Sequence, residues 1–162
     1  MKIAIGSDKS GFSLKEAIKQ HLLDIGTDFS DLGTTDLNHP QGFFVVAPAV
    51  AQKVQGGEYD LAVLVCGTGA GMSIVANKYR GVYAVACESV YSAKMARAVN
   101  NARILCMGGW IVAPEMGVKM AEAFIKTQWL EDLEDWRQAW LRGASEKVAA
   151  LEDATSTDRG NE

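Results

Sequence analysis

The sequence has few of the residues on which disulfide scaffolds and metal sites depend. Its 162 residues include three cysteines (Cys66, Cys87 and Cys106), an odd number without a Cys-x-x-Cys pair, and two histidines, His21 and His39. Disulfide frameworks and cysteine-rich zinc sites are therefore not expected, and no metal is predicted. A reducing compartment, the cytoplasm, is the expected location.

Excess positive charge and long apolar runs are also lacking. The formal charge is −4 and the sequence pI is about 5.2, whereas nucleic acids and anionic membranes attract basic surfaces. No apolar run approaches the ~20 residues that span a bilayer. The first residues, Met1-Lys-Ile-Ala-Ile-Gly6, are typical of a strand and not of a secretory leader. The predicted partner is a small molecule, with no nucleic acid and no membrane.

Short apolar runs alternate with longer segments of helical periodicity. The predicted strands, rich in Ile, Val and Leu, are residues 2–6, 27–32, 61–66, 82–87 and 103–107. The apolar positions of the first predicted helix are Leu14, Ile18, Leu22 and Ile25. Gly26 can end that helix, and Pro114 can begin another that runs through Phe124. This alternation predicts the α/β class: a doubly wound, five-stranded parallel sheet that is covered on both faces.

The C-terminal part predicts an extra helix over residues 130–151. Trp136 and Trp140 share one face of it, and that face is expected to dock either on the core of its own domain or on a second subunit. We expect a single domain over residues 1–151. Residues 152–162 have almost no apolar side chains and are expected to form a frayed tail.

The densest chemical signal is the run Cys66-Gly-Thr-Gly-Ala-Gly-Met-Ser-Ile-Val-Ala-Asn-Lys78. A buried strand delivers a cysteine to its own end, three glycines follow at alternate positions, and an amphipathic helix begins. The unpaired amides at the start of such a helix favour an anion and would favour a thiolate in Cys66. A base and an oxyanion site side by side can take a proton from a carbon next to a carbonyl and hold the enediolate.

This run has three alternative interpretations. It is not a phosphate-binding P-loop, because no Gly-Lys-Ser/Thr follows the glycines. A dinucleotide fingerprint fits poorly, since the third required glycine is Met72 and the run follows the third predicted strand instead of the first. The third interpretation is a buried cysteine before a tight turn, with no chemical role.

Further motifs complete a resemblance to a known family. Gly6-Ser-Asp8 with Gly11, the run from Cys66 to Lys78, Tyr91-Ser-Ala-Lys-Met-Ala-Arg97 and Asn100-Asn-Ala closely resemble type B ribose-5-phosphate isomerases and the related galactose-6-phosphate isomerase subunits. The resemblance extends from residue 1 to about residue 126. It implies a Rossmann-like three-layer sandwich, and an aldose–ketose isomerase of a small sugar phosphate that uses no cofactor. It also implies a homodimer or dimer of dimers with shared active sites.

The resemblance also implies roles for individual residues. Cys66 would be the proton-transferring base, and Thr68 would lie beside the substrate oxygens. The implied oxyanion-binding amides belong to the turn that contains Gly67, Gly69 and Gly71. Asp8 would hold sugar hydroxyls, and Asn100 would come from the adjoining subunit.

This sequence departs from the family pattern at positions close to the implied site. Lys9 and Val99 stand where the family has histidines associated with ring opening or phosphate contact, and Trp110 stands where an arginine is usual. Lys9 could supply a positive charge near the phosphate. Arg137 and Arg142 are the candidates for the paired C-terminal arginines that hold phosphate, although their spacing differs from that of the family.

Two explanations account for the missing histidines. A four-carbon sugar 4-phosphate cannot close a furanose ring and needs no ring-opening group, so the substrate would be a tetrose 4-phosphate. Alternatively, His39, which precedes Pro40, could carry out the proton shuttling in their place. Two other functions stay open: a non-catalytic sugar-phosphate or nucleotide sensor, and one subunit of a hetero-oligomeric isomerase.

Overall fold

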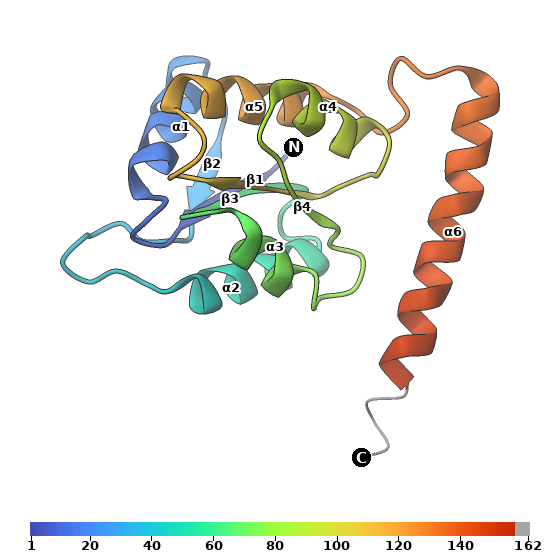
Figure 1. Ribbon diagram of the computed structural model, residues 1–162, viewed down its shortest axis with the longest axis horizontal. Helices are drawn as coiled ribbons and strands as arrows, with labels where there is room; N and C mark the ends of the chain where they lie inside the picture. The colour runs from blue at the N-terminus through green and yellow to red at the C-terminus, as the bar shows by residue number, and fades with distance from the viewer. Residues whose placement is uncertain (158–162) are drawn as a thin grey trace.

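The structure, a computed structural model, describes residues 1–157, in which five parallel strands form one sheet with helices on both faces (Figure 1). The elements in chain order are β1 (Ile3–Ser7), α1 (Phe12–Asp24), β2 (Phe29–Asp31), α2 (Phe43–Gln55), β3 (Leu61–Cys66), α3 (Ala70–Ala76), β4 (Ala84–Ala86), α4 (Val90–Ala98), β5 (Ile104–Gly108), α5 (Pro114–Lys126) and α6 (Asp135–Thr157). The strand order is β2-β1-β3-β5-β4. The predicted α/β sandwich is confirmed.

The central strands β1, β3 and β5 are buried along their whole length. Their near-continuous apolar sequences suit strands that are covered on both faces. The bounds of β3 are those predicted from the sequence. The edge strands β2 and β4 are shorter than predicted, with three residues each, because an edge strand has only one neighbour with which to pair.

Two apolar cores lie on opposite faces of the sheet. Helices α1, α4 and α5 cover one face, and α2 and α3 cover the other (Figure 1). Successive residues of β3 alternate between the two cores, so Val63 and Val65 face the first core while Leu64 and Cys66 face the second. This alternation places the Cys66 side chain on the side of α2 and α3.

The predicted helix boundaries at Gly26 and Pro114 are confirmed. Gly26 follows α1 with a φ of 67°, in the left-handed region that glycine adopts without strain. The N–H of Thr27 donates to the carbonyl of Leu22 at 2.8 Å, which satisfies an acceptor at the end of the helix. Pro114 is the first residue of α5, where a missing N–H costs nothing.

Helix α6 stands beside the β4 edge of the sandwich (Figure 1). The side chains of Trp136 and Trp140 are 70% and 66% exposed, so they do not dock on the core of their own domain. The expected frayed tail is wrong for residues 152–157, which continue the helix. Glu152 explains the difference, because its carboxylate accepts hydrogen bonds from the N–H of Gly81 at 3.2 Å and the hydroxyl of Tyr83 at 3.2 Å. The rest of the predicted tail, residues 158–162, lies outside the described residues.

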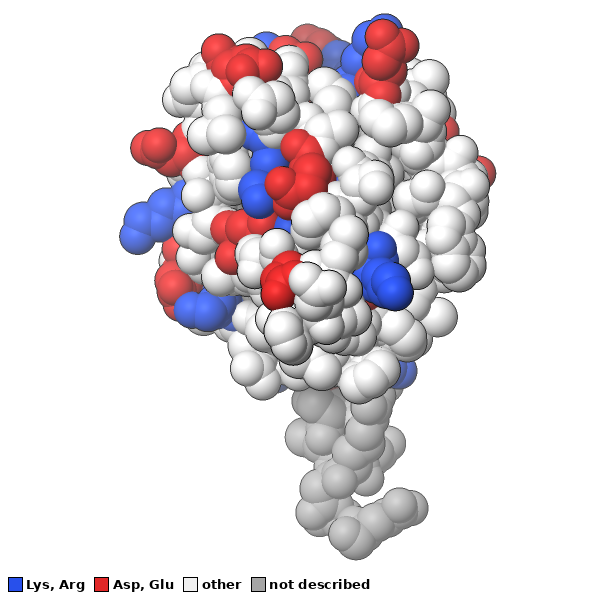
Figure 2. Space-filling model, turned by 90° about the vertical axis from the view of Figure 1, so that its left-hand side faces the viewer, with Lys and Arg blue, Asp and Glu red and all other residues white. Residues whose placement is uncertain are grey.

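Charge is mixed on the face shown in Figure 2, where acidic and basic side chains are interspersed and do not gather in one patch of a single sign. Among residues 1–157, no helix has both the length and the apolar character that crossing a bilayer requires.

Candidate active site

Cys66 and Asp8 both lie at the carboxyl edge of the sheet, at the ends of the adjacent strands β3 and β1. β2 lies on one side of β1, whereas β3, β5 and β4 lie on its other side. The direction in which strands are added therefore reverses between β1 and β3. Open α/β sheets bind ligands in the crevice at such a reversal. Asp8 follows β1, and its N–H donates to the carbonyl of Val65 at 3.2 Å. Cys66, the next residue, therefore lies beside the Asp8 loop.

Cys66 is held by the turn that follows it, which we call the cysteine turn (residues 66–71). The Cys66 side chain is only 4% exposed, and its Sγ accepts a hydrogen bond from the N–H of Gly69 at 3.1 Å. An N–H aimed at sulfur stabilises negative charge there. Gly69 has a φ of 77°, and a Cβ at this residue would lie 2.9 Å from the carbonyl carbon of Met107. Only glycine fits this position, since both the backbone angle and the space exclude a side chain.

The same turn presents amides that a ligand can use. Among the residues that the structure describes, the N–H groups of Thr68 and Gly71 have no acceptor. The hydroxyl of Thr68 accepts from the N–H of Ala70 at 3.3 Å, and the Thr68 side chain is exposed. Successive amides that converge from a turn and a helix start form an anion-binding concavity. A thiol, a hydroxyl and two amides without an acceptor among the described residues thus lie within six consecutive residues.

The other two cysteines, Cys87 and Cys106, lie outside the cysteine turn. Cys106 is fully buried, and burial, together with the neighbouring Cys66 and Cys87 sulfurs, raises its pKa well above the usual value. Burial also raises the pKa of Cys87, although a hydrogen bond with Ser92 opposes the effect. Both groups stay thiols near neutral pH and behave as apolar core side chains.

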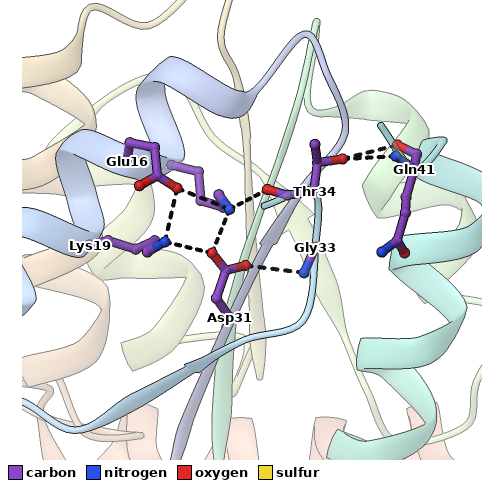
Figure 3. A network of polar contacts seen from close by, with 7 residues as sticks. Glu16, Lys19, Asp31, Gly33, Thr34 and Gln41 are labelled. Atoms are coloured by element: carbon purple, nitrogen blue, oxygen red, sulfur yellow. Dashed lines mark hydrogen bonds and ion pairs between the residues drawn. The ribbon is translucent and has the colours of Figure 1, made fainter. Parts of the chain in front are cut away.

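A buried ion network fixes the loop between β2 and α2, at the same edge of the sheet (Figure 3). The ammonium group of Lys15 is fully buried, and it donates to Asp31 Oδ2 at 2.5 Å and to the carbonyl of Thr34 at 2.6 Å. The Thr34 hydroxyl in turn accepts from the N–H of Gln41 at 3.0 Å. Both ends of the loop are thereby tied to α1.

This loop delivers an aromatic ring to the cysteine turn. Phe43 begins α2, and a Cβ on Gly71 would lie 3.1 Å from its ring. Sequence reasoning missed Phe43 and the pairing of Lys15 with Asp31. The available signal was a lysine directly beside the apolar stripe of the first helix, a position where a side chain is buried unless it bends away.

The Lys15 network gives a stability prediction. Burial opposes ionisation of Asp31, but hydrogen bonds from Lys15 and Lys19 outweigh it and hold the pKa of Asp31 below its ordinary value. We expect Lys15→Met to lower the free energy of unfolding at pH 7 by roughly 2–4 kcal/mol, because it removes one partner of a buried ion pair. Urea denaturation followed by circular dichroism measures this loss.

The pH dependence and a surface variant serve as controls. The contribution of Asp31 is present above its unfolded pKa of about 3.9 and is lost as the pH falls through the lower folded value. The difference between wild type and variant should therefore shrink below pH ~4. Lys53→Met breaks an exposed pair with Glu58 and should cost less than about 1 kcal/mol. Equal losses in the two variants would contradict the buried role of Lys15.

The remaining predicted site residues are not all brought together in one chain. Lys9 follows Asp8 and is exposed at the same edge as the cysteine turn. His39 is on the loop between β2 and α2, with a side chain that is 86% exposed and bonded through Nδ1 to Asp36 at 2.8 Å. Asn100 lies beyond the end of α4, which runs back from the carboxyl edge to the opposite edge of the sheet.

Asn100 and the two C-terminal arginines therefore lie away from Cys66 of their own chain. Asn100 lines a cavity of about 480 Å³ together with residues of α6 such as Trp140. The guanidinium of Arg142 stacks over the ring of Trp129 at 5.4 Å, and Arg137 is exposed on the same helix. Within residues 1–157, no three His, Cys, Asp or Glu side chains converge as metal ligands.

Comparisons with known proteins fit this geometry. Residues 3–139 match the family model described as Ribose/Galactose Isomerase. The 4-deoxy-4-sulfo-D-erythrose isomerase of Clostridium sp. (strain MSTE9) is 54% identical over 95% of this chain and 97% of its own length. D-erythrulose-4-phosphate isomerase 2 of Mycolicibacterium smegmatis is 41% identical over 80% of this chain and 84% of its own. The structure of Clostridium thermocellum ribose-5-phosphate isomerase B superposes with a TM-score of 0.85 at 32% identity, covering 96% of this chain and 99% of that one.

Proposed function

The chain belongs to the ribose/galactose isomerase family, and we propose that its substrates are a four-carbon aldose and ketose with an anionic group on C4. As a member of this family it is a sugar-phosphate aldose–ketose isomerase. One observation carries the four-carbon assignment: neither imidazole is built into the cysteine turn. His21 lies 3.4 Å from Glu122 on the α1–α5 side, and His39 faces solvent beside Asp36.

The chemistry of a C4-substituted tetrose explains why such a site suffices. A tetrose closes a five-membered ring through its C4 oxygen, which is blocked in a 4-phosphate and absent in a 4-deoxy-4-sulfonate. The substrate is then an open-chain carbonyl compound, and no imidazole is needed to shuttle the ring-opening proton. Two relatives support this substrate class, since they are named as isomerases of 4-deoxy-4-sulfo-D-erythrose and of D-erythrulose 4-phosphate. The higher identity of the first favours the sulfonate.

The site residues suggest the following reaction. The Cys66 thiolate removes the proton from C2 of the aldose, and the electron pair forms an enediolate. The same proton, or one from solvent, is returned to C1, while the hydroxyl proton of O2 passes to O1, so the ketose has the same composition as the aldose. The free amides of Thr68 and Gly71 stabilise the oxyanion, and Asp8 accepts hydrogen bonds from sugar hydroxyls.

We also propose that a second copy of the chain completes each site, in a homodimer or a dimer of dimers. Asn100, Arg137 and Arg142 lie away from Cys66 of their own chain, so they could contribute only to the site of a neighbour. The exposed indoles of Trp136 and Trp140 support an apolar contact between copies. Cytoplasmic location remains a prediction from composition.

A substrate panel tests the proposed function. For the isolated protein we expect kcat/KM for 4-deoxy-4-sulfoerythrulose or erythrulose 4-phosphate to exceed that for ribulose 5-phosphate by about 100-fold, the range that a missing acid–base group can produce. Reactions in deuterium oxide, followed by NMR, should place solvent deuterium on the carbon next to the carbonyl. A clear pentose preference would rule out the tetrose assignment. Turnover only with a co-purified homologous chain would instead indicate a hetero-oligomer.

A further inference from the structure

The backbone after β5 is bonded directly to the cysteine turn. The N–H of Gly109 donates to the carbonyl of Cys66 at 2.7 Å, and the N–H of Trp110 donates to the carbonyl of Gly67 at 3.0 Å. These two bonds fix the position of Trp110 relative to the turn. Trp110 therefore lies beside the cysteine turn, even though it is more than 40 residues away from Cys66 in the sequence.

The indole of Trp110 lies flat over Gly67. A Cβ on Gly67 would be 2.8 Å from each of three atoms of the six-membered ring, Cε3, Cζ3 and Cη2. Equal distances to neighbouring ring atoms mean that the ring presents its face to the glycine. The Trp110 side chain is nevertheless 74% exposed, so its other face is open. Since the Phe43 ring lies against Gly71, two glycines of the cysteine turn each lie against an aromatic ring.

The cysteine turn has few cations around it. Residues 66–73 and 108–113 contain no lysine or arginine. Lys9 lies at this edge, two residues after the end of β1, and its side chain is exposed. Within one chain, an anionic group that enters here meets backbone amides, one lysine and the open face of an indole.

We propose that Trp110 is a specificity-determining residue that favours a sulfonate over a phosphate on C4 of the substrate. A sulfonate carries one negative charge, whereas a phosphate monoester carries about −1.5 to −2 at pH 7. The face of an aromatic ring carries partial negative charge, so it repels the phosphate more strongly. Removing a doubly charged group from water also costs more, and residues 66–73 and 108–113 of the same chain supply no lysine or arginine to replace its hydration. The inference rests on the proposed function, because it assumes a C4-substituted tetrose.

The test compares the ratio of kcat/KM for 4-deoxy-4-sulfoerythrulose to kcat/KM for erythrulose 4-phosphate. In Trp110→Arg we expect this ratio to fall by about tenfold or more, mainly through KM, because an added cation favours the group with the larger charge. Trp110→Gln removes the ring without adding charge, and the ratio should fall by about threefold. Trp110→Phe keeps an aromatic face and should retain the wild-type ratio.

Leu23→Arg is the matched control. Leu23 is also an exposed apolar residue, at 61%, and lies in the last turn of α1, away from the carboxyl edge. This variant adds the same charge and should leave the ratio unchanged. An unchanged ratio in both Trp110→Arg and Trp110→Gln would overturn the inference while leaving the proposed function intact, as would an equal fall in Leu23→Arg. If wild type converts neither tetrose, the proposed function fails and the inference fails with it.

Discussion

Replacing Cys66 by serine is expected to lower kcat by about a thousandfold or more and to change KM only a few-fold. The thiolate is the only base proposed for the C–H proton, and general-base catalysis contributes ~10²–10⁴-fold in typical enzymes. A serine hydroxyl is a much weaker acid than a thiol, so it is not ionised near neutral pH. Steady-state kinetics with the preferred tetrose measures the loss, and deuterium uptake from solvent should disappear with it.

The geometry around Cys66 makes serine a suitable replacement. The oxygen can still accept the N–H of Gly69, which lies 3.1 Å from Sγ in wild type. Only one heavy atom changes, in a side chain that is 4% exposed. We therefore expect the fold and substrate binding to persist, so that the loss appears in kcat. This pattern identifies a group that acts on the transition state.

Cys87→Ser is the matched control, because Cys87 is buried to the same extent, at 4% exposure, and directly follows β4, the edge strand of the same sheet. Burial raises the pKa of the Cys87 thiol, so this residue offers no base near neutral pH. The control variant should keep kcat within about twofold of wild type, with at most a loss of stability. Comparable kcat values for Cys66→Ser and wild type would remove Cys66 from the proposed mechanism.

The central sheet could be predicted from the sequence because its strands carry their own signal. The run from Leu61 to Cys66 is apolar throughout and ends at a glycine-rich turn, so both of its bounds followed from local sequence. The cysteine turn followed for the same reason, since Gly67, Gly69 and Gly71 sit in one short segment.

Contacts between distant segments could not be predicted in this way. Periodicity places Lys15 beside the apolar stripe of α1, but whether its ammonium group stays buried depends on Asp31, which comes from another element. Phe43 against Gly71 likewise depends on the length and anchoring of a loop. Trp110 was recognised as a departure from the family pattern, but its stacking on Gly67 is visible only in the structure. Such pairings are set by tertiary packing, which local patterns do not encode.

Replacing Gly69 by alanine is expected to lower kcat/KM by about 100-fold or more and the free energy of unfolding by roughly 2–4 kcal/mol. The left-handed φ of 77° costs a residue with a Cβ ~1–2 kcal/mol. The added Cβ would also lie 2.9 Å from the carbonyl carbon of Met107 and 3.2 Å from the N of Gly108, which are backbone atoms that cannot rotate away. The turn must therefore shift, and the Gly69 N–H moves off the Cys66 sulfur. Kinetics and urea denaturation of the same preparation measure both losses.

Gly26→Ala separates backbone strain from displacement of the turn. Gly26 has a similar φ of 67°, yet a Cβ there has no atom within 4 Å, and the residue follows α1, away from the cysteine turn. This variant should lose about 1 kcal/mol of stability while keeping kcat/KM. If Gly69→Ala also lost stability but kept kcat/KM, the left-handed conformation of Gly69 would be needed for folding and not for catalysis. A large kinetic loss at Gly69 alone would show that the orientation of one backbone amide toward the sulfur controls the rate.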